Sequence, residues 1–170
     1  MKTNDFRRAC VRSFLSLFFL AGVVLAQDTA KVTATFQNLN VAFQNLPGGN
    51  LSVDFKLAEI GKWRLGAVGD FSFHDDTNDL LNRIQLLGGA SVARSLGEDR
   101  VSVFGRALFG NTRFDSTAMR NFDRVTVSVG GGLDVNFGRF FIRPVNVDFQ
   151  WIDERPVRYT RLGAGAGFRF

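Results

Sequence analysis

His74 is the one point in the sequence from which a catalytic or metal-binding argument can start. It is the only histidine in 170 residues, it opens the run His74-Asp75-Asp76, and Ser72 lies two residues before it. Residues two apart in an extended strand share a face, so Ser72 and His74 are expected to point the same way. A metal site needs more ligands, and the single cysteine, Cys10, lies near the N-terminus. Polar neighbours are common at strand ends, so we expect no catalytic site, no metal and no cofactor here.

Runs of glycine are a second feature to consider, because phosphate-binding loops are rich in glycine. Gly130-Gly131-Gly132 and the alternating Gly163, Gly165 and Gly167 are the candidates. A phosphate loop precedes a helix, whereas these glycines fall inside segments that alternate like strands. Close approach of neighbouring backbones is therefore the expected role.

The largest group of residues that could take part in chemistry is charged. Nine charged residues lie on the polar face of the alternating segments. Four are acidic and five are basic, which permits ion pairing but does not say which acid meets which base. They are Asp54, Lys56, Arg64, Asp70, Arg106, Asp134, Asp148, Arg161 and Arg169.

Residues 1–26 have the three-part pattern of a cleaved signal peptide. Arg7, Arg8 and Arg12 make a positive start, Ser13–Leu25 is apolar, and cleavage is expected after Ala26. Thirteen apolar residues are too few for a helix to span a bilayer core of about 30 Å. Removing this segment takes away Cys10 and leaves 17 basic and 15 acidic residues, so disulfides and a nucleic-acid partner are not expected.

The remaining residues, 27–170, read as one all-β domain. Nineteen phenylalanines and 18 glycines against 3 prolines favour strands. Alternation defines eight expected strands, each about long enough to cross a bilayer when tilted. They are Lys31–Phe43, Leu51–Ile60, Trp63–His74, Ile84–Arg94, Val101–Phe114, Arg124–Phe137, Phe140–Ile152 and Tyr159–Phe170.

Several details of these strands are less regular. The apolar phase slips near Gln37-Asn38, which predicts a bulge, and Gln44–Asn50 reads as a turn because it contains Pro-Gly-Gly. The facing of residues 84–94 and 101–114 stays open, because large apolar side chains occupy both faces. Connections alternate between tight turns, expected on the periplasmic side, and more polar links, expected outside.

The closing strand, YTRLGAGAGFRF, has arginine and glycine on one face and apolar residues on the other. With the segments VFGRALFGNTRF and GGGLDVNF, it makes residues 31–170 resemble the outer-membrane-protein-A type of eight-stranded barrel. The resemblance implies an antiparallel up-and-down transmembrane β-barrel, monomeric, in the outer membrane of a Gram-negative-type envelope. It also implies contact with outer-membrane lipid, and with periplasmic chaperones and the barrel assembly machinery during biogenesis. Phe168 and Phe170 resemble the C-terminal assembly signal, although Gly163 stands where that signal normally has a polar residue.

An eight-stranded barrel has a lumen just wide enough for side chains, so the nine charged residues are expected to fill it as a network of ion pairs. This predicts a structural or surface-contact role without catalysis. Two alternatives remain open. One is a narrow gated channel, and the other is a lipid-modifying enzyme, because barrels of this size that act on lipids use a histidine with a serine and a carboxylate. A lipocalin-like soluble barrel does not fit, since the charges lie on the glycine-bearing face.

Overall fold

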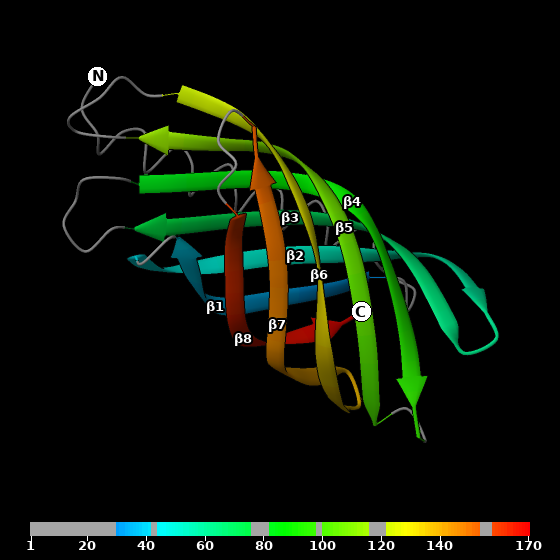
Figure 1. Ribbon diagram of the computed structural model, residues 1–170. Helices are drawn as coiled ribbons and strands as arrows, with labels where there is room; N and C mark the ends of the chain where they lie inside the picture. The colour runs from blue at the N-terminus through cyan, green and yellow to red at the C-terminus, as the bar shows by residue number, and fades with distance from the viewer. Residues whose placement is uncertain (1–29, 42–43, 76–81, 98–99, 116–121, 154–157) are drawn as a thin grey trace.

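The computed structural model describes residues 30–170 except 42–43, 76–81, 98–99, 116–121 and 154–157. The predicted signal peptide and its cleavage site lie outside the described residues. No helix in the described part is long and apolar enough to cross a membrane. Eight strands make up the fold (Figure 1): β1 (Ala30–Val41), β2 (Gln44–Ile60), β3 (Trp63–Asp75), β4 (Asn82–Leu96), β5 (Val101–Asp115), β6 (Phe122–Phe137), β7 (Phe140–Ile152) and β8 (Arg158–Arg169).

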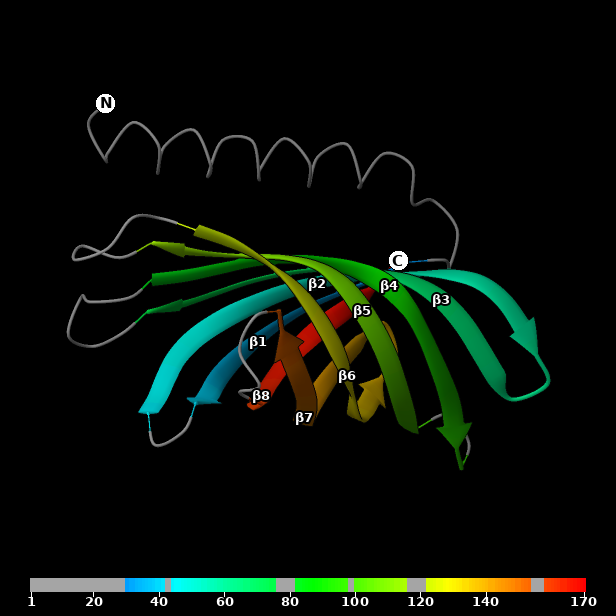
Figure 2. The same ribbon diagram turned by 45° about the horizontal axis from the view of Figure 1, so that its top comes forward.

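The strands form a closed barrel in which each pairs antiparallel with the next and β8 returns to β1 (Figures 1 and 2). The closing pair runs from Lys31 opposite Arg169 to Asn40 opposite Thr160. Closure leaves no sheet edge unpaired, as a strand protein in lipid requires. The predicted all-β, eight-stranded up-and-down barrel is confirmed, and the bounds of β7 coincide with those predicted.

Three tight connections gather at one end of the barrel, the lower right of Figure 1. Gly61, Gly97 and Gly138 lie in them with φ of 61°, 51° and 67°, a region that residues with a Cβ adopt at a cost. Both chain ends of the barrel lie there too, because the Phe170 amide donates to the Ala30 carbonyl at 2.9 Å. We call this the turn end. At the opposite, loop end, the four connections fall outside the described residues except for Asp153, which follows β7.

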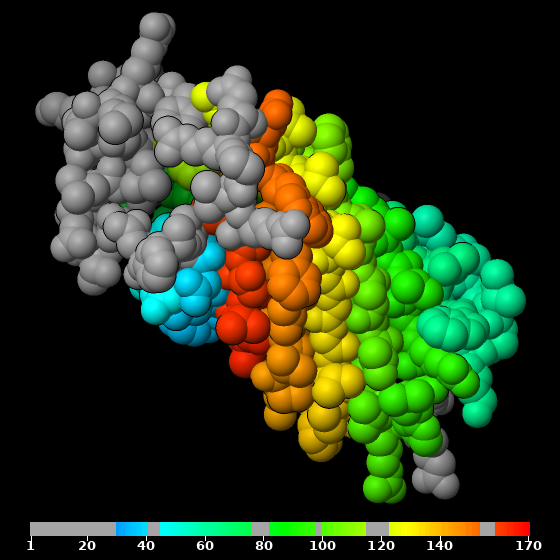
Figure 3. All heavy atoms as spheres, in the orientation of Figure 1, coloured from blue at the N-terminus to red at the C-terminus, as the bar shows by residue number. Residues whose placement is uncertain are grey.

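Side chains alternate between a polar interior and an apolar exterior. On the inside, Gln85, Thr112 and Ser128 are fully buried, while on the outside Phe36 and Phe109 are 70% and 63% exposed. Figure 3 shows the side chains of β8, β7, β6, β5 and β4 covering the wall in parallel rows. Apolar exposure on this scale, with polar groups inside, reverses the arrangement of a soluble protein and is the arrangement of a membrane barrel.

The two segments whose facing the sequence left open alternate like the others. In β4, Leu87 points inward and is 2% exposed, whereas Leu86 points outward and is 67% exposed. The ambiguity arises because the lumen contains a small apolar cluster of Val68, Leu87 and Leu108. Apolar residues on both faces therefore reflect an interior that is not uniformly polar.

The predicted bulge near Gln37-Asn38 is wrong. β1 pairs without interruption with both of its neighbours, and Leu39 continues the inward row in which Gln37 lies. Leu39 is fully buried in the lumen, so an inward apolar residue gave the impression of a shifted phase. The register shifts lie elsewhere, between Lys56 and Ala58, between Leu133 and Val135, and between Arg143 and Asn146.

The predicted turn at Gln44–Asn50 is also wrong, because these residues begin β2 and pair with β1. The two glycines serve close packing instead. A Cβ on Gly48 would lie 2.6 Å from the His74 ring inside the barrel, and one on Gly49 would lie 2.7 Å from the Phe73 ring outside. The glycines thus let two rings of β3 lie across β2, one on each face.

Val129 tests the outward face. It lies in the middle of β6 and is 46% exposed, so Val129→Arg should lower the free energy of unfolding by about 2–4 kcal/mol if the site is near mid-bilayer. Phe137→Arg, on the same face at the turn end, should cost only about 0–1 kcal/mol. Denaturant titration of the refolded variants in lipid measures both. Equal costs would contradict the assigned depth and facing.

Candidate functional site: the charged lumen

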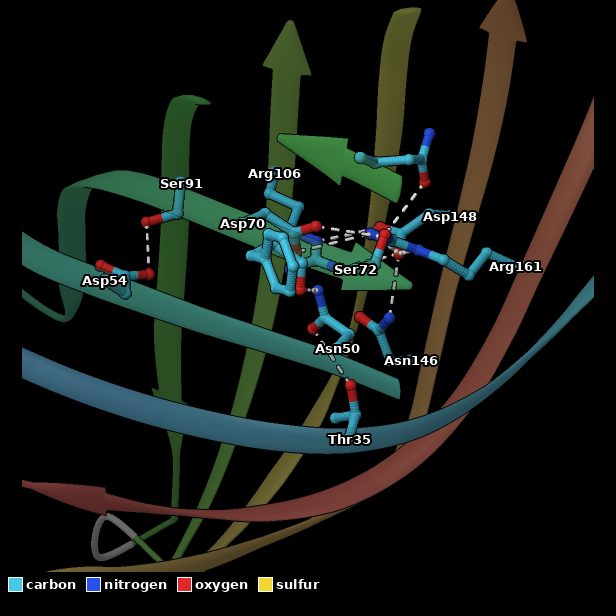
Figure 4. Close-up of polar contacts among 12 residues, drawn as sticks. Thr35, Asn50, Asp54, Asp70, Ser72, Ser91, Arg106, Asn146, Asp148 and Arg161 are labelled. Atoms are coloured by element: carbon cyan, nitrogen blue, oxygen red, sulfur yellow. Dashed lines mark hydrogen bonds and ion pairs between the residues drawn. The ribbon is translucent and has the colours of Figure 1, made fainter. Parts of the chain in front are cut away.

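Four charged side chains form a closed cluster in the middle of the lumen (Figure 4). Arg106 of β5 donates to Asp148 of β7 through Nε and Nη2, at 2.9 and 2.7 Å, and to Asp70 of β3 through Nη1 at 3.0 Å. Arg161 of β8 also binds both carboxylates, with Nε 2.9 Å from Asp148 and Nη1 3.1 Å from Asp70. Two arginines thus share two aspartates, and the charges balance.

The barrel register brings this central cluster together. Arg106 lies opposite Gly130, Gly130 opposite Asp148, and Asp148 opposite Arg161, so one row crosses four strands. A Cβ on Gly130 would lie 2.1 Å from the Asp148 carboxylate, so glycine is required there. Asp70 completes the cluster from β3. Because all four side chains are at most 3% exposed, each charge depends on its partners.

Neutral polar groups continue the network from this central cluster toward the loop end. The Ser72 hydroxyl donates to Gln85 at 3.1 Å and accepts from Arg161 at 3.2 Å, while Gln85 donates to Thr112 at 2.8 Å. Arg83 donates to Gln150 at 2.7 Å. Its guanidinium lies 5.6 Å from the Phe114 ring and 5.0 Å from the Tyr159 ring, where cation–π attraction stabilises it.

A second charged group lies nearer the turn end. Arg143 binds Asp134 through Nε at 2.8 Å, and Lys31 forms an ion pair with the same carboxylate. The two cations also stack on aromatic rings, with Arg143 4.0 Å from the Phe104 centroid and Lys31 4.3 Å from the Phe141 centroid. One carboxylate therefore serves two cations, and aromatic faces provide the remaining stabilisation.

The other predicted residues are more dispersed. Asp54 accepts from Ser91 at 2.7 Å, and Lys56 pairs with Glu59 at the half-exposed rim. Arg169 donates to Asn136 at 2.5 Å. Arg64 lines a cavity at the turn end. Of the nine predicted charged residues, the structure joins Asp70, Arg106, Asp148 and Arg161 to one another, while Asp134 pairs with cations that the prediction did not include.

Sequence reasoning missed Lys31, Arg83 and Arg143. The inward row of β1 that contains Thr33 also contains Lys31, so strict alternation could have found it. The predicted strand begins at Ile84 and so excludes Arg83, whereas β4 begins at Asn82. The register shift between Arg143 and Asn146 hides Arg143, because Pro144 lies between them and cannot donate a ladder hydrogen bond.

His74 faces the lumen and is 2% exposed. Among the described residues, neither of its imidazole nitrogens has a hydrogen-bond partner. Ser72 binds Gln85 and Arg161, so the described side chains do not form the serine–histidine hydrogen bond that a nucleophile needs. Within the described part, no group of three or more histidine, cysteine or carboxylate residues could hold a metal ion.

Comparison with solved structures places this fold among small outer-membrane barrels. The attachment invasion locus protein Ail of Yersinia pestis matches 84% of this chain and 97% of its own, at 20% identity and a TM-score of 0.55. The N-terminal β-barrel domain of Pseudomonas aeruginosa OprF matches 85% and 100%, at 18% identity and a TM-score of 0.58. The outer-membrane enzyme PagL matches 80% and 97%, at 12% identity and a TM-score of 0.54. No protein-family model and no curated protein matches the sequence. These matches confirm the predicted fold, that of the eight-stranded outer-membrane barrels.

Replacing Arg161 tests how much the central cluster contributes to the stability of the barrel. Arg161→Met leaves two buried aspartates with one arginine, and should lower the free energy of unfolding by about 3–5 kcal/mol. Lys56→Met removes a half-exposed ion pair and should cost at most about 1 kcal/mol. Denaturant titration in lipid compares the two. A cost for Arg161→Met no larger than that for Lys56→Met would show that the central pairs contribute little to stability.

Proposed function

We propose that the protein is a monomeric integral barrel of the outer membrane of a Gram-negative-type cell envelope, with a structural or surface-contact role and no catalysis. The observation that carries the proposal is the balanced cluster of Asp70, Arg106, Asp148 and Arg161, which occupies the middle of the lumen. Its donors and acceptors bind one another across the lumen, which supports a closed interior. Ail, described as an attachment invasion locus protein, shares the fold, which supports a contact role at the loop end.

The channel alternative would require this cluster to open. An arginine that leaves two aspartates must exchange strong charge-assisted hydrogen bonds for water in a confined space. The neighbouring bonds from Asn146 to Asp148 at 2.9 Å and from Arg161 to Ser72 at 3.2 Å would be disturbed as well. We therefore favour a closed lumen over a narrow gated channel.

The enzyme alternative rests on His74 and on the shared fold with PagL, which is described as an outer-membrane enzyme. Lipid chemistry needs a nucleophile and base within reach of lipid. His74 instead lies inside the barrel wall, and the Ser72 hydroxyl is held by two other side chains. The geometry thus favours a structural role for both residues.

Biogenesis provides the proposed partners besides outer-membrane lipid, namely periplasmic chaperones and the barrel assembly machinery. Phe168 ends the apolar row of β8, 42% exposed, and the Phe170 ring packs edge-on against it with centroids 5.2 Å apart. Two accessible aromatic rings at the turn end form a feature that such machinery could recognise on the last strand.

Membrane fractionation with gel mobility and planar-bilayer recording tests the proposal. The protein should be recovered in the outer membrane, should migrate differently before and after boiling, and should give no stable conductance. Recovery in the soluble periplasm without a mobility shift would refute the membrane assignment. Reproducible single-channel openings would favour the channel instead.

Deletion of Phe170 tests the assembly signal. The deleted chain should accumulate unfolded in the periplasm, because recognition is lost, yet refold from urea into lipid nearly as well as the parent. Phe140→Ala is a matched control that removes an outward ring beside Phe168 without touching the last strand. Normal outer-membrane levels of the deleted chain would contradict a recognition role for Phe170.

A further inference from the structure

A cavity of about 380 Å³ lies in the lumen at the turn end. It is bordered by the ends of several strands and by the turn residues Lys62, Gly138 and Arg139. Its volume falls in the range of small-molecule sites. We call it the vestibule, and it lies beside the charged group formed by Lys31, Asp134 and Arg143.

The vestibule carries an excess of positive charge. Among the described residues, seven lysine and arginine side chains line it, against two carboxylates, those of Asp54 and Glu59. Asp134, the next carboxylate inward, is shared by Lys31 and Arg143. The charge balance of the central cluster therefore does not extend to this end of the lumen.

Aromatic rings partly take the place of the missing carboxylates. The Phe141 ring is fully buried, and Lys31, Arg143 and Arg169 lie 4.3, 5.9 and 5.8 Å from its centroid. A Cβ on Gly167 would lie 2.2 Å from this ring, so that glycine makes the space for it. Ring faces attract cations without using their N–H donors, so the donors of Lys31 and Arg143 that do not bind Asp134 can bind an anion.

The surroundings strengthen the effect of this charge. A cleft lined by one sign of charge between walls of low dielectric constant concentrates the electric field, and lipid around the barrel would keep the walls apolar. Guanidinium groups match phosphate oxygens in shape and donor geometry. Several of these cations come from different strands, β1, β3, β7 and β8, so they surround the space instead of forming a flat patch.

We propose that the vestibule binds an anion that carries phosphate groups with more than one negative charge in total. Arg64 and Arg139 would hold it at the mouth, and Lys31, Arg143 and Arg169 would face it from within. The phosphate can belong to a soluble molecule or to a lipid headgroup of the adjacent leaflet. The site goes beyond the structural role proposed above and can be tested on purified barrel whatever that role is.

Calorimetric titration of inorganic pyrophosphate into the folded protein, in an uncharged detergent at low ionic strength, tests the site. We expect saturable binding at one site per barrel, weakened by added salt. The double variant Arg64→Gln with Arg139→Gln should weaken binding roughly tenfold, since each removes one partly exposed ion pair.

The matched control is Arg94→Gln with Arg100→Gln, which removes the same charge near the same end but outside the vestibule. Arg94 lies on the outer wall, 5.1 Å from the Trp63 ring. This control should bind pyrophosphate like the parent. Absence of saturable binding by the parent, or equal weakening in both double variants, would overturn the proposal.

A second arm identifies the source of the phosphate. The titration is repeated in nanodiscs of zwitterionic lipid, with and without phosphatidylglycerol. If a lipid headgroup occupies the vestibule, the anionic lipid should compete and weaken pyrophosphate binding by the parent but not by the Arg64/Arg139 variant. If the ligand is soluble, the lipid should change the parent and the variant alike. Both results presuppose the saturable site, which the first arm establishes or refutes.

Discussion

The polar interior depends on one interaction, in which Arg106 and Arg161 share the carboxylates of Asp70 and Asp148. Desolvating a charge inside a lipid-embedded barrel is very costly, and only a partner with good geometry offsets it. Here each guanidinium binds both carboxylates, and each carboxylate receives both guanidinium groups. The four residues come from β3, β5, β7 and β8, so the cluster also ties opposite walls of the barrel together.

A barrel of eight strands constrains what can surround such a cluster. The lumen of an eight-stranded barrel is narrow, so several large inward side chains lie where the residue opposite them is a glycine. Gly130 makes room for Asp148, Gly48 for His74, and Gly167 for Phe141. The glycines that looked like turns or phosphate loops thus determine how the polar interior packs, and the alternation of glycine with arginine in β8 follows from the same need.

Much of the fold was predictable because lipid outside and polar groups inside impose alternation along every strand. The strand order, the tight turns at Gly61 and Gly138 and most strand bounds followed from that rule. The sequence-based prediction failed where the alternation of polar and apolar residues is locally broken. Leu39 is apolar but points inward, Pro47 and its glycines lie within β2, and Pro144 accompanies a register shift that reverses the phase before Arg143. The pairings of charges depend on the register of non-adjacent strands, which a single sequence does not encode visibly.

The middle and the turn end of the polar interior differ in net charge. Strand alternation does not require this difference. The central cluster is neutral, and its aspartates and arginines bind one another, which suits a closed lumen. Toward the turn end, three cations gather around Phe141 and one carboxylate. A purely structural filling would gain stability from one more carboxylate there, since like charges in a confined space repel one another. Retaining the excess charge beside an accessible cavity is instead what recognition of an anion requires, and it separates a part of the barrel that maintains the fold from a part available for binding.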